Sequence, residues 1–239
     1  MATITLIRHG QASFGSENYD ELSDLGQEQA SQLGKRFKQQ GAEFDFVLLG
    51  SMHRHRQTAE TCLTELGSSL DATQNELNPG WNEYDHQNIL AQFNPELASA
   101  QSTKAWVAQQ QNPLLAFEAA FNGAVHQWMD ASQNDIGTPQ FDYTESWSVY
   151  KQRIHDAFQQ AIALGREHRN IAVFTSGGPI SLLSQFLLGV PERNLMSLNW
   201  TLVNCGVTKV VSASSRQFIA SLNDHAHFEG AQTNLITYK

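Results

Sequence analysis

Short apolar runs rich in β-branched residues recur along the chain, separated by stretches with a different periodicity. The first run covers residues 3–7, and similar runs follow at 44–49 and 171–175. Runs of this length and composition predict buried β-strands. Residues 207–211 and 218–222 predict two closing strands, which we expect to pair as a hairpin.

The stretches between these runs place apolar residues three and four positions apart, which predicts amphipathic helices. The first helix would be capped by Ser23 or Asp24 and would end near Gly41. A second helix would end at Gly67, and Pro179 suits the first turn of a later one. The apolar stripes are Ala30, Leu33, Gly34 and Phe37; Ala59, Cys62, Leu63 and Leu66; Trp147, Tyr150, Ile154, Ala157, Phe158 and Ala161; and Leu182, Leu183, Phe186 and Leu187.

Residues 86–142 do not follow this alternation. They are rich in Gln, Asn and Ala, and they contain one helical stripe and no convincing strand. The stripe consists of Leu114, Phe117, Phe121, Val125 and Trp128. We therefore expect a helical lid, inserted at about 86–142 into a single domain that covers residues 1–239.

Strands that alternate with helices predict an α/β fold of three layers, α/β/α, in which a mainly parallel sheet carries helices on both faces. In such sheets, ligands bind beyond the carboxyl ends of the strands. Three polar loops would lie at that edge, at residues 8–13, 50–54 and 175–179. We expect the functional site there.

Composition narrows the classes of protein that fit. The 239 residues are 41% hydrophobic and 16% charged, which is typical of a globular chain. A net charge of −9 disfavours nucleic-acid binding, which needs a basic surface. An anionic substrate would therefore need a local basic pocket within an acidic protein.

The cysteines and the apolar runs bear on location. Cys62 and Cys205 do not form a disulfide framework, which favours a reducing compartment. The apolar start is too short for a secretory signal, and no run approaches the roughly 18 apolar residues of a membrane span. We expect a cytoplasmic protein with no nucleic-acid or membrane partner, and the sequence leaves its oligomeric state open.

Arg8, His9 and Gly10 follow the first predicted strand directly. A neutral histidine there can attack phosphorus and hold the phosphoryl group covalently. The adjacent Arg8 disfavours the cationic form of His9 and offers forked donors that match phosphate oxygens. Gly10 would leave room for a substrate to approach the backbone. Taken alone, Arg8 and His9 could equally be a surface pair in a turn.

A second basic segment lies between a predicted strand and a helix start, where free backbone donors favour anions. Arg54 is the candidate for a second phosphate clamp. We expect His53, His55 and Arg56 at the outer rim or in structural roles. No metal site is predicted from these histidines, because the adjacent arginines oppose a divalent ion.

Several short motifs follow one another in chain order. They are Arg8-His9-Gly10-Gln11, Leu22-Ser23 with Gly26, Gln29 and Ala30, Arg54 with Gln57-Thr58-Ala59, Glu145-Ser146 with Arg153, and Asn223-Asp224 with His227. In this order and spacing they resemble the signature of the histidine phosphatase superfamily, in its phosphoglycerate mutase-like branch 1. Each motif is modest alone, but together they are highly specific.

The resemblance implies roles for the matched residues. His9 would be the phosphoryl-accepting nucleophile, and Arg8 and Arg54 would bind the transferred phosphate and stabilise its charge in the transition state. The loops would add substrate-binding groups. These are Gly10, Gln11, Ser13, Ser176 and Gly177.

The resemblance also implies a carboxylic acid that protonates the leaving oxygen, placed between the second and third core strands. Glu83 is the closest match, with Asp85 and Glu76 as weaker alternatives. A general acid near neutral pH needs a raised pKa, which burial behind Trp81 and Tyr84 would provide. Without that burial, Glu83 would be a solvated loop carboxylate.

The chain departs from the family pattern after the third core strand. The family places a second catalytic histidine where this chain has Ser176. A serine hydroxyl donates a hydrogen bond but brings no charge, and losing one preorganised donor costs roughly 100- to 1,000-fold in rate. We expect the amides of Gly177 and Gly178 at the helix start to compensate. The alternative is that another histidine takes this place. The candidates are His53, His55, His86 and His227.

We therefore expect a phosphomonoester hydrolase that works through phospho-His9, without metal or cofactor, on a small phosphorylated substrate. Its activity would be reduced by Ser176. One alternative is a non-catalytic phospholigand-binding protein of the same fold. The other is a phosphoglycerate mutase-like phosphotransferase, which is disfavoured because the segment between Glu83 and Glu145 does not resemble the insertion of those mutases.

Overall fold

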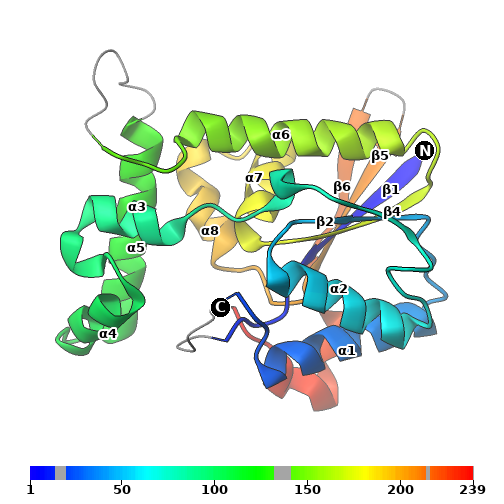
Figure 1. Cartoon of the computed structure of the whole chain (residues 1–239), viewed down its shortest axis with the longest axis horizontal. Helices are drawn as coiled ribbons and strands as arrows, with labels where there is room; N and C mark the ends of the chain where they lie inside the picture. Colours follow the sequence, from blue (N-terminus) through cyan, green and yellow to red (C-terminus); the bar gives the residue numbers. More distant parts are fainter. Residues whose placement is uncertain (14–19, 132–140, 214–215, 239) are drawn as a thin grey trace. The chain divides into compact units, whose positions relative to one another are not determined.

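The computed structural model describes residues 1–13, 20–131, 141–213 and 216–238. The chain divides into two compact units, drawn together in Figure 1. The first unit combines Met1–Glu83 with Ile154–Lys239, and the second is Tyr84–Arg153. Among the described residues, no helix combines the length and apolar character needed to cross a membrane.

The first unit is built on a six-stranded sheet in the order β3-β2-β4-β1-β5-β6. The strands are β1 Ala2–Arg8, β2 Phe46–Leu49, β3 Gln74–Leu77, β4 Asn170–Thr175, β5 Val207–Ala213 and β6 Arg216–Asp224. The first four strands pair in parallel, while β5 pairs antiparallel with β1 and β6 pairs antiparallel with β5. The predicted mainly parallel sheet is confirmed, and residues 214–215 between the last two strands lie outside the described residues.

Differences in side-chain burial explain why the sequence predicts some strands of the sheet and not others. The side chains of β1, β2 and β4 are almost all buried, as expected for central parallel strands with covered faces. In contrast, β6 alternates between exposed and half-buried positions at the edge of the sheet. The exposed and polar β3 was not predicted, because it is an edge strand that needs only the backbone hydrogen bonds of β2.

Helices lie on both sides of this sheet, as Figure 1 shows, with α1 and α2 on one side and α6 and α7 on the other. The helices of the first unit are α1 Asp24–Gln39, α2 His53–Leu66, α7 Gly177–Leu188, α8 Leu195–Asn199 and the part of α6 Trp147–Leu164 from Ile154 onward. Short 3-10 helices cover Pro79–Trp81, Glu192–Asn194, Ala226–Phe228 and Gly230–Leu235. The predicted three-layer α/β/α arrangement is confirmed.

The predicted helix boundaries follow from capping. The Ser23 hydroxyl accepts a hydrogen bond from the Gly26 amide at 3.1 Å and starts α1. Gly67 and Gly189 end α2 and α7 with φ values of 98° and 66°, in the left-handed region that favours glycine. The Pro179 ring lies in the first turn of α7, as expected.

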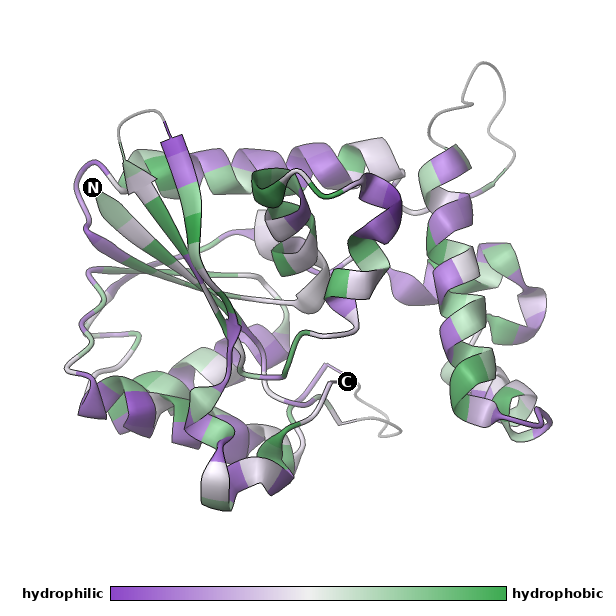
Figure 2. Ribbon diagram, turned by 180° about the vertical axis from the view of Figure 1, so that it is seen from behind, coloured by the Kyte–Doolittle hydropathy of each residue, from purple (hydrophilic) through white to green (hydrophobic). Residues whose placement is uncertain are grey.

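The main core lies where α1 and α2 pack on the sheet. It includes Leu33, Phe37 and Leu63 from the helices and Phe174 from β4, all at least 97% buried. Each such side chain contributes about 1.5–3 kcal/mol. Gly34 allows close helix contact, because a Cβ there would lie 2.3 Å from the Cys62 carbonyl oxygen. Figure 2 shows the corresponding pattern, with mostly hydrophobic central strands and helices of mixed character.

The second unit is helical, with no strand among its described residues. Its elements are α3 His86–Phe93, the 3-10 helix Pro95–Leu97, α4 Ala100–Ala108, α5 Pro113–Ala131 and the start of α6. Four packed rings, of Tyr84, Trp128, Trp147 and Tyr150, form its aromatic core. The predicted helical character of this insertion is confirmed for the described residues, and its role as a lid stays a prediction.

One motif from the sequence belongs to this second unit. The Arg153 guanidinium binds both carboxylate oxygens of Glu145, each at 2.7 Å, and lies 5.0 Å from the centre of the Tyr150 ring. The Trp128 indole donates to the Glu145 carbonyl at 2.7 Å. Glu145 and Arg153 therefore form an internal ion pair at the start of α6, and the backbone of Glu145 is joined to α5 through Trp128.

Candidate active site

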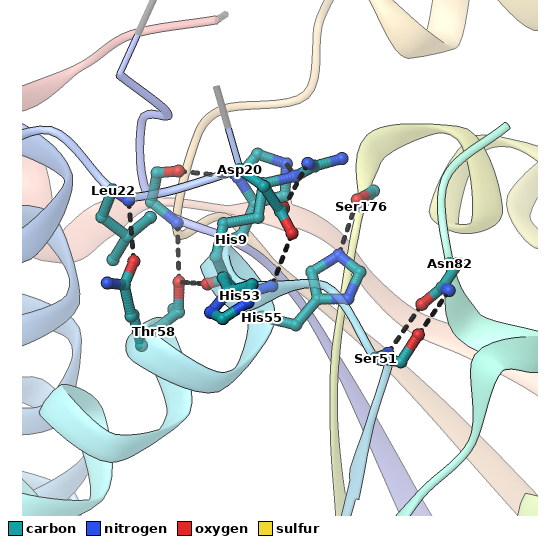
Figure 3. A network of polar contacts seen from close by, with 12 residues as sticks. His9, Asp20, Leu22, Ser51, His53, His55, Thr58, Asn82 and Ser176 are labelled. Atoms are coloured by element: carbon teal, nitrogen blue, oxygen red, sulfur yellow. Dashed lines mark hydrogen bonds and ion pairs between the residues drawn. The ribbon is translucent and has the colours of Figure 1, made fainter. Parts of the chain in front are cut away.

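The carboxyl ends of β1 and β4 bring two of the predicted loops together. Arg8 is the register partner of Thr175, and the His9 amide donates to the Thr175 carbonyl at 2.9 Å. His9 and Ser176 therefore leave the sheet side by side, at the edge where parallel strands bind ligands. The loop after β2 reaches the same edge, as Figure 3 shows.

The imidazole of His9 is held in one orientation. Its Nδ1 lies 2.7 Å from the Gly10 carbonyl oxygen, so Nδ1 carries the proton and donates. In the neutral ring, Nε2 then has a lone pair, and the Arg54 Nε–H donates to it at 3.1 Å. The side chain is only 7% exposed. Nε2 is therefore unprotonated in the neutral ring, which is the state in which an imidazole can act as a nucleophile.

The surroundings of His9 favour its neutral form. Burial lowers its pKa well below 6.5, and the positive charges of Arg54 and Arg8, together with the neighbouring His55, lower it further. The hydrogen bond to the Gly10 carbonyl acts in the opposite direction. The ring is therefore neutral at physiological pH.

Arg54 lies in the first turn of α2, with its side chain almost fully buried. Its Nη1 forms an ion pair with the Asp20 carboxylate at 2.7 Å. The other Asp20 oxygen accepts from the His53 amide at 2.8 Å, so this carboxylate also caps the start of α2. Asp20 is not among the residues predicted from the sequence, since no spacing pattern singles out an acidic residue in that polar loop.

Arg8 ends β1 and directly precedes His9. Its Nη1 donates to the carbonyl oxygens of Leu202 and Tyr238, the latter at 3.1 Å. A Cβ on Gly177 would lie 3.5 Å from the Arg8 Nε, so this guanidinium packs against the start of α7. The structure thus brings together His9, both predicted arginines and the loop after β4.

His55, one of the histidines considered for the place of Ser176, is a buried member of this site. Its ring is fully buried, its Nε2 lies 2.7 Å from the Ser176 Oγ, and its centre lies 5.7 Å from the centre of the His9 ring. Burial lowers the pKa of His55 well below 6.5, and Arg54 lowers it further. Of the two predicted alternatives for His55, its burial excludes the outer rim and leaves a structural role, whereas His53 and Arg56 are exposed.

A signal for this position was present in the sequence. His55 lies four residues before Ala59 and seven before Cys62, on the stripe that predicts the buried face of α2. Extending that stripe toward the start of the helix places His55 inside. The outer rim was offered as an alternative because polar residues near a helix start are more often exposed.

The Glu83 side chain contacts the start of α7. Its Oε2 accepts from the Gly178 amide at 3.0 Å, and the residue is half-buried. The other candidate acids have different partners. Glu76 accepts from Gln160 at 2.7 Å, and Asp85 caps α3 in the second unit by accepting from Asn88. Of the three candidate acids, Glu83 is thus the one for which the structure describes a contact with the segment that follows β4.

This contact changes the expectation for the helix start. The Gly178 amide, which was expected to cradle the phosphate, instead donates to the Glu83 carboxylate. A helix N-terminus favours any anion, and a side-chain carboxylate meets that preference here. Four histidines were considered for the place of Ser176. For one of them, His55, the structure describes a hydrogen bond with Ser176. His227 instead packs on the Phe228 ring.

The other predicted substrate-binding residues contact α1 or the residues that lead into it. A Cβ on Gly10 would lie 2.4 Å from the Gly26 carbonyl, so α1 backbone fills the room expected for the substrate. The Gln11 Oε1 accepts from the Ser23 hydroxyl at 3.0 Å. The Ser13 amide donates to the Glu21 carbonyl at 2.8 Å. The substrate-binding roles of these three residues stay predictions.

The solved structures of two phosphatases are similar to this chain over nearly its whole length. The alpha-ribazole phosphatase from Shigella flexneri is 19% identical with a TM-score of 0.61, and the match covers 93% of this chain and 96% of that one. The phosphoserine phosphatase from Entamoeba histolytica, solved with 3-phosphoglyceric acid, is 18% identical with a TM-score of 0.62, covering 95% and 99%. At this level of identity, the likeness shows a common fold.

Sequence comparison is more specific about the family. The 2,3-bisphosphoglycerate-dependent phosphoglycerate mutase of Bartonella tribocorum is 32% identical over 73 residues, which make up 28% of this chain and 35% of that relative. The chain thus matches about a third of the length of this relative. A sequence model of the histidine phosphatase superfamily, branch 1, matches residues 4–118 and 116–225. With nearly all of its sequence matched, this chain belongs to branch 1 of the histidine phosphatase superfamily.

Proposed function

We propose that this protein is a phosphomonoester hydrolase that transfers the phosphoryl group of a small substrate to Nε2 of His9. The observation that carries this proposal is the neutral, buried His9, with its Nδ1 proton on the Gly10 carbonyl and its Nε2 facing Arg54. The cytoplasmic location expected from the composition remains part of the proposal.

In the first step, the Nε2 lone pair attacks phosphorus, a P–N bond forms and the ester P–O bond breaks. Glu83 gives a proton to the leaving oxygen. The phosphorylated ring, which keeps its Nδ1 proton, becomes cationic, and the Gly10 carbonyl stabilises that charge through the 2.7 Å contact.

Both arginines would act on the charge of the phosphoryl group. Arg54 lies against Nε2 before substrate binds and would turn its donors to the phosphoryl oxygens as Nε2 attacks. The Asp20 ion pair would hold its guanidinium in place during that exchange. Arg8 would bind the same group from the side of α7.

In the second step, water attacks the phosphohistidine. The Glu83 carboxylate takes a proton from that water, phosphate leaves, and His9 returns to its neutral form. Glu83 thus gives and takes one proton per turnover, which requires a carboxyl group close to the phosphoryl site. The hydrogen bond from the Gly178 amide favours the carboxylate form and so supports the base role in this second step.

The test is phosphate release from an aryl phosphate between about pH 5 and 7, in the presence of a chelator. Wild-type protein should release phosphate and carry an acid-labile phosphoryl group on His9, detected by mass spectrometry at low temperature. His9→Asn should abolish both. His168→Asn is the matched control, since it lies just before the amino end of β4, at the opposite end of that strand from Ser176. Release by His9→Asn at the wild-type rate would refute the proposal.

A phosphotransferase is the second candidate, because the curated relative named above is a phosphoglycerate mutase. It predicts phosphoryl exchange between positions of a phosphorylated metabolite that is faster than release to water. Net hydrolysis without exchange would exclude it.

A non-catalytic binder of phosphorylated ligands is the third candidate, motivated by Ser176. It predicts that inorganic phosphate raises the melting temperature although no phosphohistidine forms. Detection of phospho-His9 would count against it.

A further inference from the structure

The mechanism above leaves one buried imidazole without a role. His55 is fully buried, and burying a polar ring is costly unless it is hydrogen-bonded. Its Nε2 has the Ser176 hydroxyl at 2.7 Å. A Cβ on Gly50 would lie 2.1 Å from the His55 Nδ1, so glycine at position 50 makes room for the ring. The fold therefore accommodates an imidazole at a specific place.

That place adjoins the nucleophile. Ser176 directly follows β4, whose last residue, Thr175, pairs with Arg8 just before His9. The rings of His55 and His9 lie 5.7 Å apart, and the next residue, Gly177, packs on the Arg8 guanidinium. His55 and Ser176 therefore form the side of the His9 site that faces α7, as the close-up in Figure 3 shows.

Hydrogen-bond chemistry sets the direction of this pair when an anion is bound. A phosphoryl oxygen can only accept, so a Ser176 hydroxyl that contacts it would donate its proton to it. The Ser176 Oγ would then accept its other hydrogen bond from the Nε2–H of His55, in the tautomer whose Nδ1 carries no proton. A hydroxyl that accepts from a ring N–H is a stronger donor, because hydrogen bonds in a chain polarise one another.

We propose that His55 is a positioning residue that acts through Ser176, and that the two form a relay directing the serine hydroxyl at the phosphoryl group on His9. This inference rests on the proposed function. The relay lets the His55 imidazole on α2 orient and polarise the hydroxyl of Ser176, the residue that directly follows β4. It adds no charge, and its effect is therefore confined to the donor strength and direction of that hydroxyl.

The test is a double-mutant cycle on aryl phosphate hydrolysis. Ser176→Ala and His55→Leu should each lower kcat by about 10-fold or more, while KM changes by less than about 3-fold. The double variant should be at most about 3-fold slower than the slower of the two single variants, since either change breaks the same relay. Effects that multiply, or a Ser176→Ala variant with wild-type kcat, would overturn the proposal.

Matched controls separate the relay from a structural role. Ser184→Ala removes another buried serine from α7, and His168→Leu removes a histidine next to the opposite end of β4. Both should keep wild-type kcat. Inorganic phosphate should raise the melting temperature of Ser176→Ala and wild type to a similar extent, because the relay acts mainly in the transition state. A matching loss of phosphate stabilisation would instead indicate general damage to the site and would overturn the relay.

Mass spectrometry distinguishes failure of the relay from failure of the proposed function. Phospho-His9 in wild type, with kcat unchanged across the cycle, would refute the relay alone. Absence of both phospho-His9 and phosphate release in wild type would refute the hydrolase and the relay together.

Discussion

The Nε of Arg54 lies 3.1 Å from the Nε2 of His9, so a guanidinium rests on the nitrogen that would attack phosphorus. The same side chain is tied to Asp20 at 2.7 Å through Nη1. One side of the guanidinium is therefore anchored while the other meets the lone pair of His9. A phosphoryl group that binds at Nε2 meets a positive charge already in place, which is the arrangement that lowers the cost of reorganisation.

Arg54→Lys should reduce hydrolysis of an aryl phosphate by about 100-fold or more, because an ammonium group cannot contact Asp20 and the phosphoryl group in the forked geometry of a guanidinium. Arg56→Lys is the matched control. Arg56 is two residues along the same helix, half-exposed, and paired with Glu60 at 3.2 Å. Steady-state kinetics of both variants checks this, and equal effects would contradict a specific role for Arg54.

Glu83→Gln should spare the hydrogen bond from the Gly178 amide, because the amide oxygen still accepts, but it removes the transferable proton. We expect a loss of about 100-fold or more in kcat/KM, which reports the steps up to loss of the leaving group, on an alkyl phosphate and a much smaller loss in kcat/KM on an aryl phosphate, whose leaving group needs little protonation. Glu76→Gln, the weaker candidate paired with Gln160, should leave both rates near wild type. Comparable losses on the two substrates would argue against proton donation by Glu83.

Acid should destabilise the fold through its buried and half-buried histidines. Burial lowers the pKa of His227 from 6.5 to about 4, and it also lowers the pKa of His9 and of His55. Between about pH 6.5 and 4 the unfolded chain binds more protons, so the free energy of unfolding falls as pH falls, by up to about 3 kcal/mol from His227. Above pH 6.5 this contribution is constant.

The measurement is denaturant unfolding of wild type and His227→Gln at several pH values within that window. The variant should lose less stability on acidification. His155→Gln changes an exposed histidine on α6 and should keep the wild-type slope. If His227→Gln loses as much stability as wild type, His227 is not a source of the acid sensitivity.

Two serines on α7 should respond oppositely to removal of the hydroxyl. Within the described part of the chain, the buried Ser184 hydroxyl has no hydrogen-bond partner, whereas the Ser181 hydroxyl donates to the Gly177 carbonyl at 2.8 Å. Ser184→Ala should therefore leave stability unchanged or raise it by about 1 kcal/mol, and Ser181→Ala should lower it by about 1 kcal/mol. Thermal unfolding of the two variants decides this, and a destabilised Ser184→Ala would show that its hydroxyl is satisfied in solution.

The local sequence determined most of the first unit. Buried strands such as β1 and β4 are continuous apolar runs, and Ser23, Gly67 and Gly189 mark helix ends by their own conformational preferences. The edge strand β3 could not be predicted in this way, because its conformation comes from pairing with β2 rather than from its own side chains.

The sequence by itself also pointed to the chemical groups of the site, because Arg8, His9 and Arg54 stand where a strand ends or a helix begins. Only the tertiary structure decided their partners: Asp20 on Arg54, the Glu83 carboxylate on the Gly178 amide, and His55 on Ser176. These contacts join residues 34 to 121 positions apart in the chain. Periodicity and capping report on neighbours within a turn or a strand, whereas a hydrogen bond between distant segments depends on how the sheet and helices pack.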